Sequence, residues 1–370
     1  NDIYFITCRY ISLHFVTFRY ISLHCATLRY IALRVITSRY IALHCISELL
    51  KNGYSVRGSL RTPDRESQVR NAISSEVEAK NNLEFCKLDL TSDEGWEDAM
   101  DGCTYVLHVA SPFPFKEPKN EDEVITPARE GTLRALNAAK KAGIKKVVLT
   151  SSVAAIQYGH DDPNKRFNHN DWTNIDGPGV TPYVKSKTIA EKAAWDFINS
   201  QDEKNLELTV INPSFVLGPS LSDDIGGTST DTIKRFLNRA IPAVPNVYMN
   251  YVDVRDIAKL HVEAIKNENS NGKRFACTSN ESVHLVEIAK TLNGNGFPNV
   301  TKKIMPDFII KFLALFSSEM KTMKTFLHQK ILMDNSQTIE VFGWEPIPFE
   351  KTVIDMGTSV QNIMTEKKKK

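Results

Sequence analysis

The sequence predicts an α/β fold built on a doubly wound parallel sheet. From residue 34 onward, short apolar runs rich in β-branched residues alternate with longer segments of helical periodicity. Two of the helical segments stop at glycines, Gly53 and Gly143, which are typical of helix C-termini. Such alternation implies right-handed crossovers between parallel strands, and it places a ligand beyond the carboxyl ends of those strands.

The individual elements follow from local pattern. Each predicted strand is a short apolar run bounded by turn-forming residues. The predicted strands are residues 34–38, 54–61, 83–90, 103–111, 144–156 and 206–219. Each predicted helix has apolar residues three and four positions apart. The predicted helices are residues 40–53, 95–102, 126–143 and 183–200.

A decapeptide repeat precedes these elements and runs into them. Starting at successive threonines, its four copies read TCRYISLHFV, TFRYISLHCA, TLRYIALRVI and TSRYIALHCI. A ten-residue period keeps the same side chains on one face of a strand but rotates them around a helix. We interpret residues 1–33 as an N-terminal extension without a confident fold, produced by duplication of a short coding unit. A β-rich or oligomerising extension is the alternative.

Composition narrows the functional class only modestly. Apolar residues make up 42% and charged residues 24%, as in ordinary soluble domains, and the net charge of +2 gives no reason to expect nucleic acid. The six cysteines form no CxxC pair, so we expect reduced thiols in a cytoplasmic protein and no metal site. No apolar run is long enough for a membrane span, so no membrane partner is expected.

Three polar residues near predicted strand ends carry the chemistry. Tyr183 and Lys187, in YVKSK, lie four residues apart on one face of a predicted helix. A cationic Lys187 is expected to lower the pKa of Tyr183 from about 10, which makes the phenol a general acid for a carbonyl oxygen. Ser152 follows a predicted strand and would stabilise negative charge on the same oxygen.

Longer stretches make the pattern specific. In chain order they read KLDLTSDEGWEDAMDGCTYVLHVASP, EGTLRALNAAKKAGIKKVVLTSS, YVKSKTIAEKAAW, INPSFVLGP and YVDVRDIAKLHVEAI. In these stretches the chain resembles the extended short-chain dehydrogenase/reductase family, within the NAD-dependent epimerase/dehydratase superfamily. The branch it resembles most is that of the dihydroflavonol-reductase-like carbonyl and aldehyde reductases. The resemblance covers about residues 41 to 360.

The resemblance implies a domain layout. One extended domain would span residues 34–370, with a Rossmann-type core and a smaller C-terminal substrate-binding subdomain. The core would comprise about 34–212 plus 251–264, and the subdomain about 213–250 and 265–355. The segment 251–258 would pack the substrate-binding subdomain onto the Rossmann-type core. We interpret Asp253 and Arg255, within this segment, as a structural ion pair.

The resemblance also implies roles for individual residues. Ser152, Tyr183 and Lys187 would be the catalytic triad, with Tyr183 and Lys187 also contacting the cofactor and Lys187 holding the nicotinamide ribose. The other cofactor-binding residues would be Asp89 and Leu90 beside the adenine, Val109, Ala110 and Ser111 along the middle, and Pro213 and Ser214 beside the nicotinamide.

The end of the second strand indicates which nicotinamide cofactor is used. An NAD enzyme usually carries an acid there, which binds the ribose 2′-hydroxyl. Here the strand ends in SLRTPD, with Arg61 at that place. Because a guanidinium suits a 2′-phosphate, the sequence favours NADP, with NAD as the alternative.

The phosphate-binding turn departs from the family pattern T-G-x-x-G-x-[IL]-[GA]. The chain reads VITSRYIALHC, so Tyr40, Ile41 and Ala42 fit the pattern, but Arg39 replaces the second glycine and the first is also missing. Those glycines allow a tight turn and a close approach of the main chain to the pyrophosphate. The N-terminus of the following helix and Arg39 itself would still attract phosphate.

Several functions therefore stay open. The chain is either an active NADP-dependent reductase of a small-molecule aldehyde or ketone, or a family member with impaired cofactor binding. A nucleotide-sugar epimerase or dehydratase and a non-catalytic binding protein on the same fold are the further alternatives. Aromatic residues in the variable regions indicate a partly apolar substrate: Phe113, Phe115, Tyr158, Trp172 and Phe215. A monomer and a homodimer are equally compatible with the sequence.

Overall fold

The structure is a computed structural model that describes residues 30–34, 39–111, 118, 120–202, 205–223 and 227–369. The first 29 residues, which hold most of the repeat, lie outside the described residues. The same applies to the phosphate-turn positions 35–38, to the side chain of Arg39, and to Phe113 and Phe115. In the described part of the chain, no helix is long and apolar enough to cross a bilayer.

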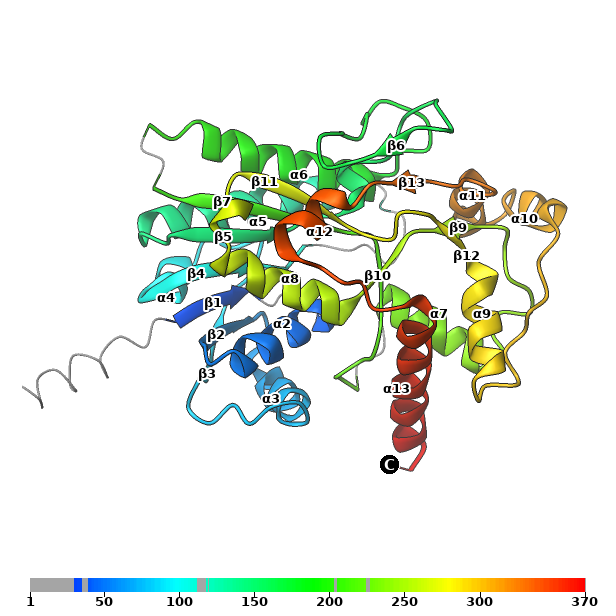
Figure 1. Ribbon diagram of the computed structural model, residues 1–370, viewed down its shortest axis with the longest axis horizontal. Coiled ribbons are helices and arrows are strands. Elements are labelled where there is room, and N and C mark those ends of the chain that lie inside the picture. The colour runs from blue at the N-terminus through cyan, green and yellow to red at the C-terminus, as the bar shows by residue number, and fades with distance from the viewer. Residues whose placement is uncertain are drawn as a thin grey trace, which may run out of the picture.

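Seven parallel strands form the central sheet, in the order β11-β7-β5-β4-β1-β2-β3 (Figure 1). Their bounds are β1 Tyr30–Arg34, β2 Ser55–Leu60, β3 Leu83–Lys87, β4 Cys103–His108, β5 Lys146–Thr150, β7 Glu207–Pro213 and β11 Lys273–Cys277. The chain winds from β1 to one edge and then from β4 to the other, which confirms the predicted doubly wound sheet. A crevice is expected where the order reverses, beyond the ends of β1 and β4.

Helices cover both faces of this sheet (Figure 1). One face carries α4 (Trp96–Met100), α5 (Asp122–Lys141) and α6 (Pro182–Asn199). The other carries α2 (Arg39–Lys51), α3 (Glu66–Ser74) and α8 (Val254–Lys266). Each layer buries its own apolar cluster against the strands, so the sheet is sandwiched between two cores.

A smaller unit packs beyond the carboxyl ends of the strands. Its own apolar core lies between α7 (Thr228–Leu237), α9 (Leu285–Gly294) and α13 (Phe349–Lys369). Two short helices belong to the same unit, α10 (Asp307–Leu313) and α11 (Ser318–Thr325), whereas α12 (Ser336–Phe342) packs against β11 and α8. Three short strand pairs complete it: β8 Phe215–Leu217 with β10 Tyr251–Asp253, β9 Tyr248–Met249 with β12 Val283–His284, and β6 Arg166–Phe167 with β13 Leu332–Met333.

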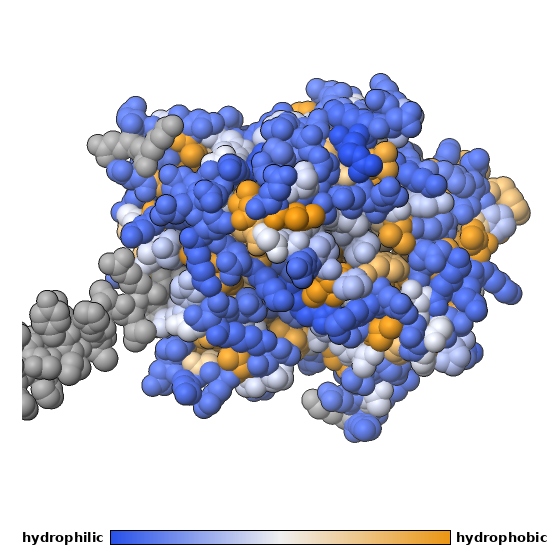
Figure 2. All heavy atoms as spheres, viewed as in Figure 1, coloured by the Kyte–Doolittle hydropathy of each residue, from blue (hydrophilic) through white to orange (hydrophobic). Residues whose placement is uncertain are grey.

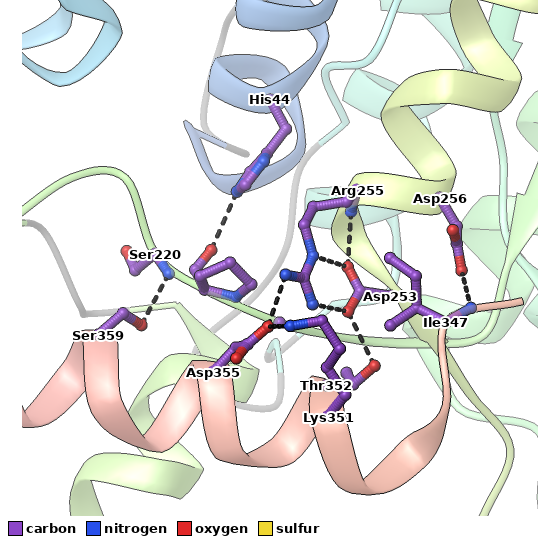
Figure 3. Close-up of polar contacts among 12 residues, drawn as sticks. His44, Ser220, Asp253, Arg255, Asp256, Ile347, Lys351, Thr352, Asp355 and Ser359 are labelled. Atoms are coloured by element: carbon purple, nitrogen blue, oxygen red, sulfur yellow. Dashed lines mark hydrogen bonds and ion pairs between the residues drawn. The ribbon is translucent and has the colours of Figure 1, made fainter. Parts of the chain in front are cut away.

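A polar cluster at the start of α8 joins the two units (Figure 3). Arg255 lies between two carboxylates, with Nη2 at 2.7 Å from Asp253 Oδ2 and Nη1 at 2.6 Å from Asp355 Oδ2 on α13. Thr352, also on α13, donates a hydrogen bond of 2.8 Å to Asp253. These contacts confirm Asp253 and Arg255 as a structural ion pair.

Some predicted boundaries were wrong. The first described strand is Tyr30–Arg34, which begins four residues before the predicted start at 34, so a boundary at residue 33/34 cuts through a strand of the central sheet. The letters YIAL occur twice, and residues 30–33 form a strand whereas residues 40–43 form a helix, so the repeat itself does not determine which copy enters the sheet. Strand β11 also belongs to the central sheet, although 265–355 was assigned to the smaller unit, because the chain returns to pair with β7.

Candidate active site

A cavity of about 830 Å³ opens at the carboxyl ends of the strands. One wall comes from the start of α2 and the segments after β4, β5 and β7, and the opposite wall comes from the smaller unit. All three predicted catalytic residues line it: Ser152, Tyr183 and Lys187. Because the residues come from β5 and α6, the fold alone brings them together.

Ser152 is held in place by the turn that follows β5. Its backbone is extended, and its hydroxyl accepts a hydrogen bond of 3.1 Å from the amide of Ala154, as the N-cap of a short 3₁₀ turn. The hydroxyl lies 3.4 Å from the carbonyl oxygen of Pro213 and also hydrogen bonds with Tyr183. Ser152 is thus positioned to contact the same oxygen as the phenol.

Tyr183 stands in the first turn of α6, which Thr181 caps through its side chain. Burial raises the pKa of Tyr183 to about 12, and the hydrogen bond from Ser152 opposes this rise. The expectation that the pKa of Tyr183 falls below its ordinary value was wrong, because burial is the largest influence on it and raises it. The ammonium nitrogen of Lys187 lies 5.9 Å from the ring centroid. The phenol therefore stays protonated at neutral pH, which is the state that an acid needs.

Lys187 lies one turn further along α6 and is buried. Burial lowers its pKa to about 8, while the carboxylate of Glu191 acts in the opposite direction. Among the described residues that line the cavity, Lys187 is the one charged side chain. It is still mostly cationic at neutral pH, so it can stabilise a phenolate that forms on Tyr183.

A buried ion pair lies behind this triad. Glu191, one turn after Lys187, accepts a hydrogen bond of 2.5 Å from Arg274 on β11. Its other oxygen accepts hydrogen bonds from Ser151 at 2.5 Å and from Asn212 at 2.7 Å. Asn212 in turn donates a 3.1 Å hydrogen bond to the carbonyl of Ser152. Glu191 thus connects the strands that carry Ser152 to the helix that carries Tyr183 and Lys187.

The predicted cofactor residues after β4 and β7 divide between wall and core. Val109, Ser111, Pro213 and Ser214 line the cavity, whereas Ala110 is buried in the apolar cluster beneath α5. The hydroxyl oxygen of Ser214 is buried with no hydrogen-bond partner among the described residues. An unpartnered polar atom in a cavity wall is what a bound polar ligand would satisfy.

The predicted adenine-end residues lie together at the ends of β2 and β3. Arg61 Nε is 2.9 Å from Asp89 Oδ2, and the Arg61 side chain is 65% exposed. Leu90 is buried, and Gly131 on α5 packs so closely against it that a Cβ there would lie 2.2 Å from its side chain. Arg61 is therefore accessible to a phosphate, but Asp89 already engages it.

The beginning of α2 faces the cavity as the pattern predicted. Tyr40 and Ile41 line the cavity, and Ala42 is fully buried, as expected for the small residue that lets helix and strand pack closely. The first amides of a helix have no partners within it, so they can donate to an anion. The residues present thus fit a dinucleotide at its nicotinamide and adenine ends, while the glycine positions 36 and 39 lack the family's residues.

Other parts of the wall were predicted only in part. Of the predicted aromatic residues, Tyr158 and Phe215 line the cavity, while Trp172 stacks on Arg274 at 3.6 Å, outside the lining. Glu191 was not predicted, although its position four residues after Lys187 was a visible signal. The smaller unit adds an unpredicted group of side chains to the wall: Tyr248, Met249, Phe326, Gln329 and Ile331.

Comparison with known proteins agrees with this architecture. The profile of the family described as "NAD dependent epimerase/dehydratase family" matches residues 37–277. Tetraketide alpha-pyrone reductase 1 of Arabidopsis thaliana is 34% identical over 239 residues, covering 64% of this chain and 72% of the relative. Cinnamoyl-CoA reductase CAD2 of Medicago truncatula is 34% identical over 249 residues, covering 66% and 74%.

The solved structures include Gre2 from Candida albicans in complex with NADPH. It has a TM-score of 0.73 and 27% identity, and the match covers 90% of this chain and 99% of that one. The fold, the position of the cavity and the family match lead to one assignment: this chain belongs to the NAD-dependent epimerase/dehydratase family, the extended short-chain dehydrogenases/reductases.

Proposed function

We propose that the protein is an NADP-dependent reductase of neutral, largely apolar aldehydes or ketones. The observation that carries this proposal is the meeting of Ser152, Tyr183 and Lys187 in a cavity whose described wall has no other charged side chain. The relatives named above are reductases, and the Gre2 structure was determined with NADPH. Both facts support reduction with NADP as the cofactor.

In this proposal, the three residues of the triad have separate roles in the reduction of the substrate carbonyl. The cofactor, when bound, supplies the hydride. Tyr183 donates its proton to the carbonyl oxygen, and Ser152 donates a hydrogen bond to the same atom and fixes its position. Lys187 stabilises the negative charge that remains on the phenolate. Pro213 and Ser214 would lie beside the nicotinamide, Val109 and Ser111 along the middle of the cofactor, and Arg61 near the 2′-phosphate.

The cavity wall favours a neutral substrate. The phosphates of the cofactor would lie at the N-terminus of α2, so a nucleotide-sugar substrate would bring further phosphates, which need cationic partners of their own when they leave water. Apart from Lys187, the wall that the structure describes offers hydroxyls, amides and apolar groups. Its outer part is aromatic, with Tyr158 and Phe326 in edge contact at 6.1 Å between ring centroids. An apolar carbonyl compound therefore fits better than a phosphorylated one.

A competition among substrate classes tests this assignment. We expect NADPH consumption, followed by absorbance, with apolar aldehydes and ketones, and little with nucleotide sugars. Lys187→Met is the control, because it removes the cation while keeping an unbranched side chain. Turnover confined to phosphorylated substrates would contradict the proposal. Equal turnover in the control would refute the role of the triad.

A specific feature favours a second candidate, a member of the family with impaired cofactor binding. Arg39 stands where the second glycine belongs, and the first glycine is absent. A residue forced to positive φ costs about 1–2 kcal/mol, and a side chain in the phosphate path costs more. Titration of the protein with NADPH separates the candidates, since the impaired form would not saturate at millimolar concentrations. Stable folding without binding or turnover, even after the glycines are restored, would indicate a non-catalytic role.

A further inference from the structure

An exposed apolar surface lies on the smaller unit, apart from the active site. Across the described residues, seven large apolar side chains are exposed, and six of them lie between residues 304 and 316. We call these six the α10 patch: Ile304, Phe308, Phe312, Leu313, Leu315 and Phe316. Figure 2 shows apolar surface at the right-hand edge of the molecule, where Figure 1 places α10. Exposed apolar side chains gathered in this way mark an interaction site.

The patch has the geometry of an amphipathic helix face. Phe308, Phe312 and Phe316 follow at four-residue spacing, and the rings of Phe312 and Phe316 lie 5.5 Å apart. Their side chains are between 60% and 77% exposed, whereas Ile310 on the same helix is fully buried. The helix is therefore anchored by one face and presents Phe308 and Phe312 to solvent on the other, and Phe316, in the turn after the helix, extends this aromatic surface.

Charge defines the surroundings of the patch. Six lysines between residues 302 and 330 are exposed: Lys302, Lys303, Lys311, Lys321, Lys324 and Lys330. The described carboxylate in this range, Asp307, is engaged, because it accepts hydrogen bonds from Asn246 at 2.7 Å and His328 at 2.6 Å. The rim is thus cationic around an aromatic centre, and this combination is typical of helices that lie on anionic membranes.

We propose that the α10 patch docks the protein onto an anionic lipid surface. The phenylalanines would enter the headgroup boundary while the lysines contact lipid phosphates and carboxylates. A second copy of the chain fits this surface less well, because two such faces would bring together cationic rims, with six lysines against two carboxylates, Asp307 and Glu319, between residues 302 and 330. The chain that follows the patch supplies Phe326, Gln329 and Ile331 to the cavity wall, so docking would bring the smaller unit's side of the cavity toward the membrane. The proposal does not depend on the proposed reaction.

Flotation of the full-length protein with lipid vesicles tests this proposal. We expect it to float with vesicles that contain phosphatidylserine and much less with pure phosphatidylcholine, and added salt should weaken binding. Phe312→Ser with Phe316→Ser should weaken binding at least about tenfold, and Lys321→Glu with Lys324→Glu about as much. Ile339→Ser is the matched control, since it removes the seventh exposed apolar side chain, on α12, and should leave binding unchanged.

The outcomes separate the possible occupants. Absence of flotation overturns the proposal. Flotation that persists in the double phenylalanine variant also overturns it, because the lipid contact would then lie elsewhere, for example in the N-terminal repeat. Sedimentation that shows a dimer for the native chain and a monomer for that variant would make the patch a self-association surface instead. Unchanged thermal unfolding midpoints would show that the variants fold.

Discussion

The two ends of the cofactor crevice differ in how completely they are built. At the catalytic end, Ser152, Tyr183 and Lys187 meet in one cavity, and a buried ion pair of Glu191 and Arg274 supports them from behind. At the phosphate end, α2 presents Tyr40 and Ile41 to the same cavity, but the glycines that should precede the helix are missing. A complete catalytic apparatus thus faces an incomplete anchor for its cofactor.

The difference teaches that the two functions are separable. In the proposed reaction, proton transfer depends on side chains fixed by β5, β7 and α6, and none of these elements includes the altered turn. Phosphate binding depends on main-chain amides, whose accessibility is decided by what stands beside them. Changes at one end are therefore expected to leave the other end intact, and each of the following experiments tests that separation.

The largest effect is expected at the catalytic end. Tyr183→Phe removes the proton donor but keeps the ring, so turnover should fall about 10²–10⁴-fold while NADPH affinity stays within a small factor. Steady-state reduction rates and a separate NADPH titration measure the two quantities. Near-native turnover in this variant would show that another group supplies the proton.

Removal of the supporting carboxylate should cost stability. Glu191→Ala leaves Arg274 buried without its partner, which is expected to lower the free energy of unfolding by about 3–5 kcal/mol. Urea unfolding measures this loss. The matched control is Glu121→Ala. Glu121 forms a surface ion pair with Lys185 of α6, the helix that also carries Glu191, and its Oε2 lies 2.8 Å from Lys185 Nζ. That pair should contribute less than about 1 kcal/mol to the free energy of unfolding. An equal loss of unfolding free energy in both variants would show that the buried ion pair of Glu191 stabilises the fold no more than a surface pair does.

Restoring the glycines should improve the phosphate end. Ile36→Gly together with Arg39→Gly recreates the family turn, and NADPH should then bind about tenfold more tightly, because the side chains that would crowd the approach of the main chain to the pyrophosphate are removed. Fluorescence titration gives the dissociation constant. An unchanged or weaker constant would show that Arg39 compensates by pairing with a phosphate. The turnover of saturated enzyme should hardly change if the two ends are independent.

The pH dependence reports on the catalytic end alone. Burial lowers the pKa of Lys187 to about 8 and raises that of Tyr183 to about 12, so the active form has both groups protonated. The rate of carbonyl reduction should be level below pH 8 and should fall about tenfold per pH unit above it, as Lys187 loses its charge. A decline that begins only near the ordinary lysine pKa would show that the ammonium is better stabilised than its burial implies.

The smallest effect is expected at the adenine end. Arg61→Ala should reduce the preference for NADPH over NADH severalfold, because the side chain is largely exposed and Asp89 already pairs with it. Ratios of kcat/KM for the two cofactors measure this preference. A preference for NADH in the native chain would remove the assignment of Arg61.

The sequence predicted strands β2, β3, β4, β5 and β7 and helices α2, α4, α5 and α6, because those features are local or periodic. It did not predict β11, α3 or α8. It could not predict Glu191 with Arg274, since the partners lie 83 residues apart and meet only after β11 returns to the sheet. The start of α5 at Asp122 was also missed, because Pro127, expected near the first turn, lies inside the helix. The pKa of Tyr183 depends on burial, which spacing along a helix does not reveal.

The origin of the central strand in the repeat has a consequence for folding. β1 is taken from the third copy, and the second copy offers YISLH at residues 20–24 in place of YIALR. A longer connection to α2 would cost little, because loop-closure entropy grows by only about 0.6 kcal/mol per doubling of length. The polypeptide thus contains two closely similar five-residue stretches, of which the structure places the later one between β2 and β4.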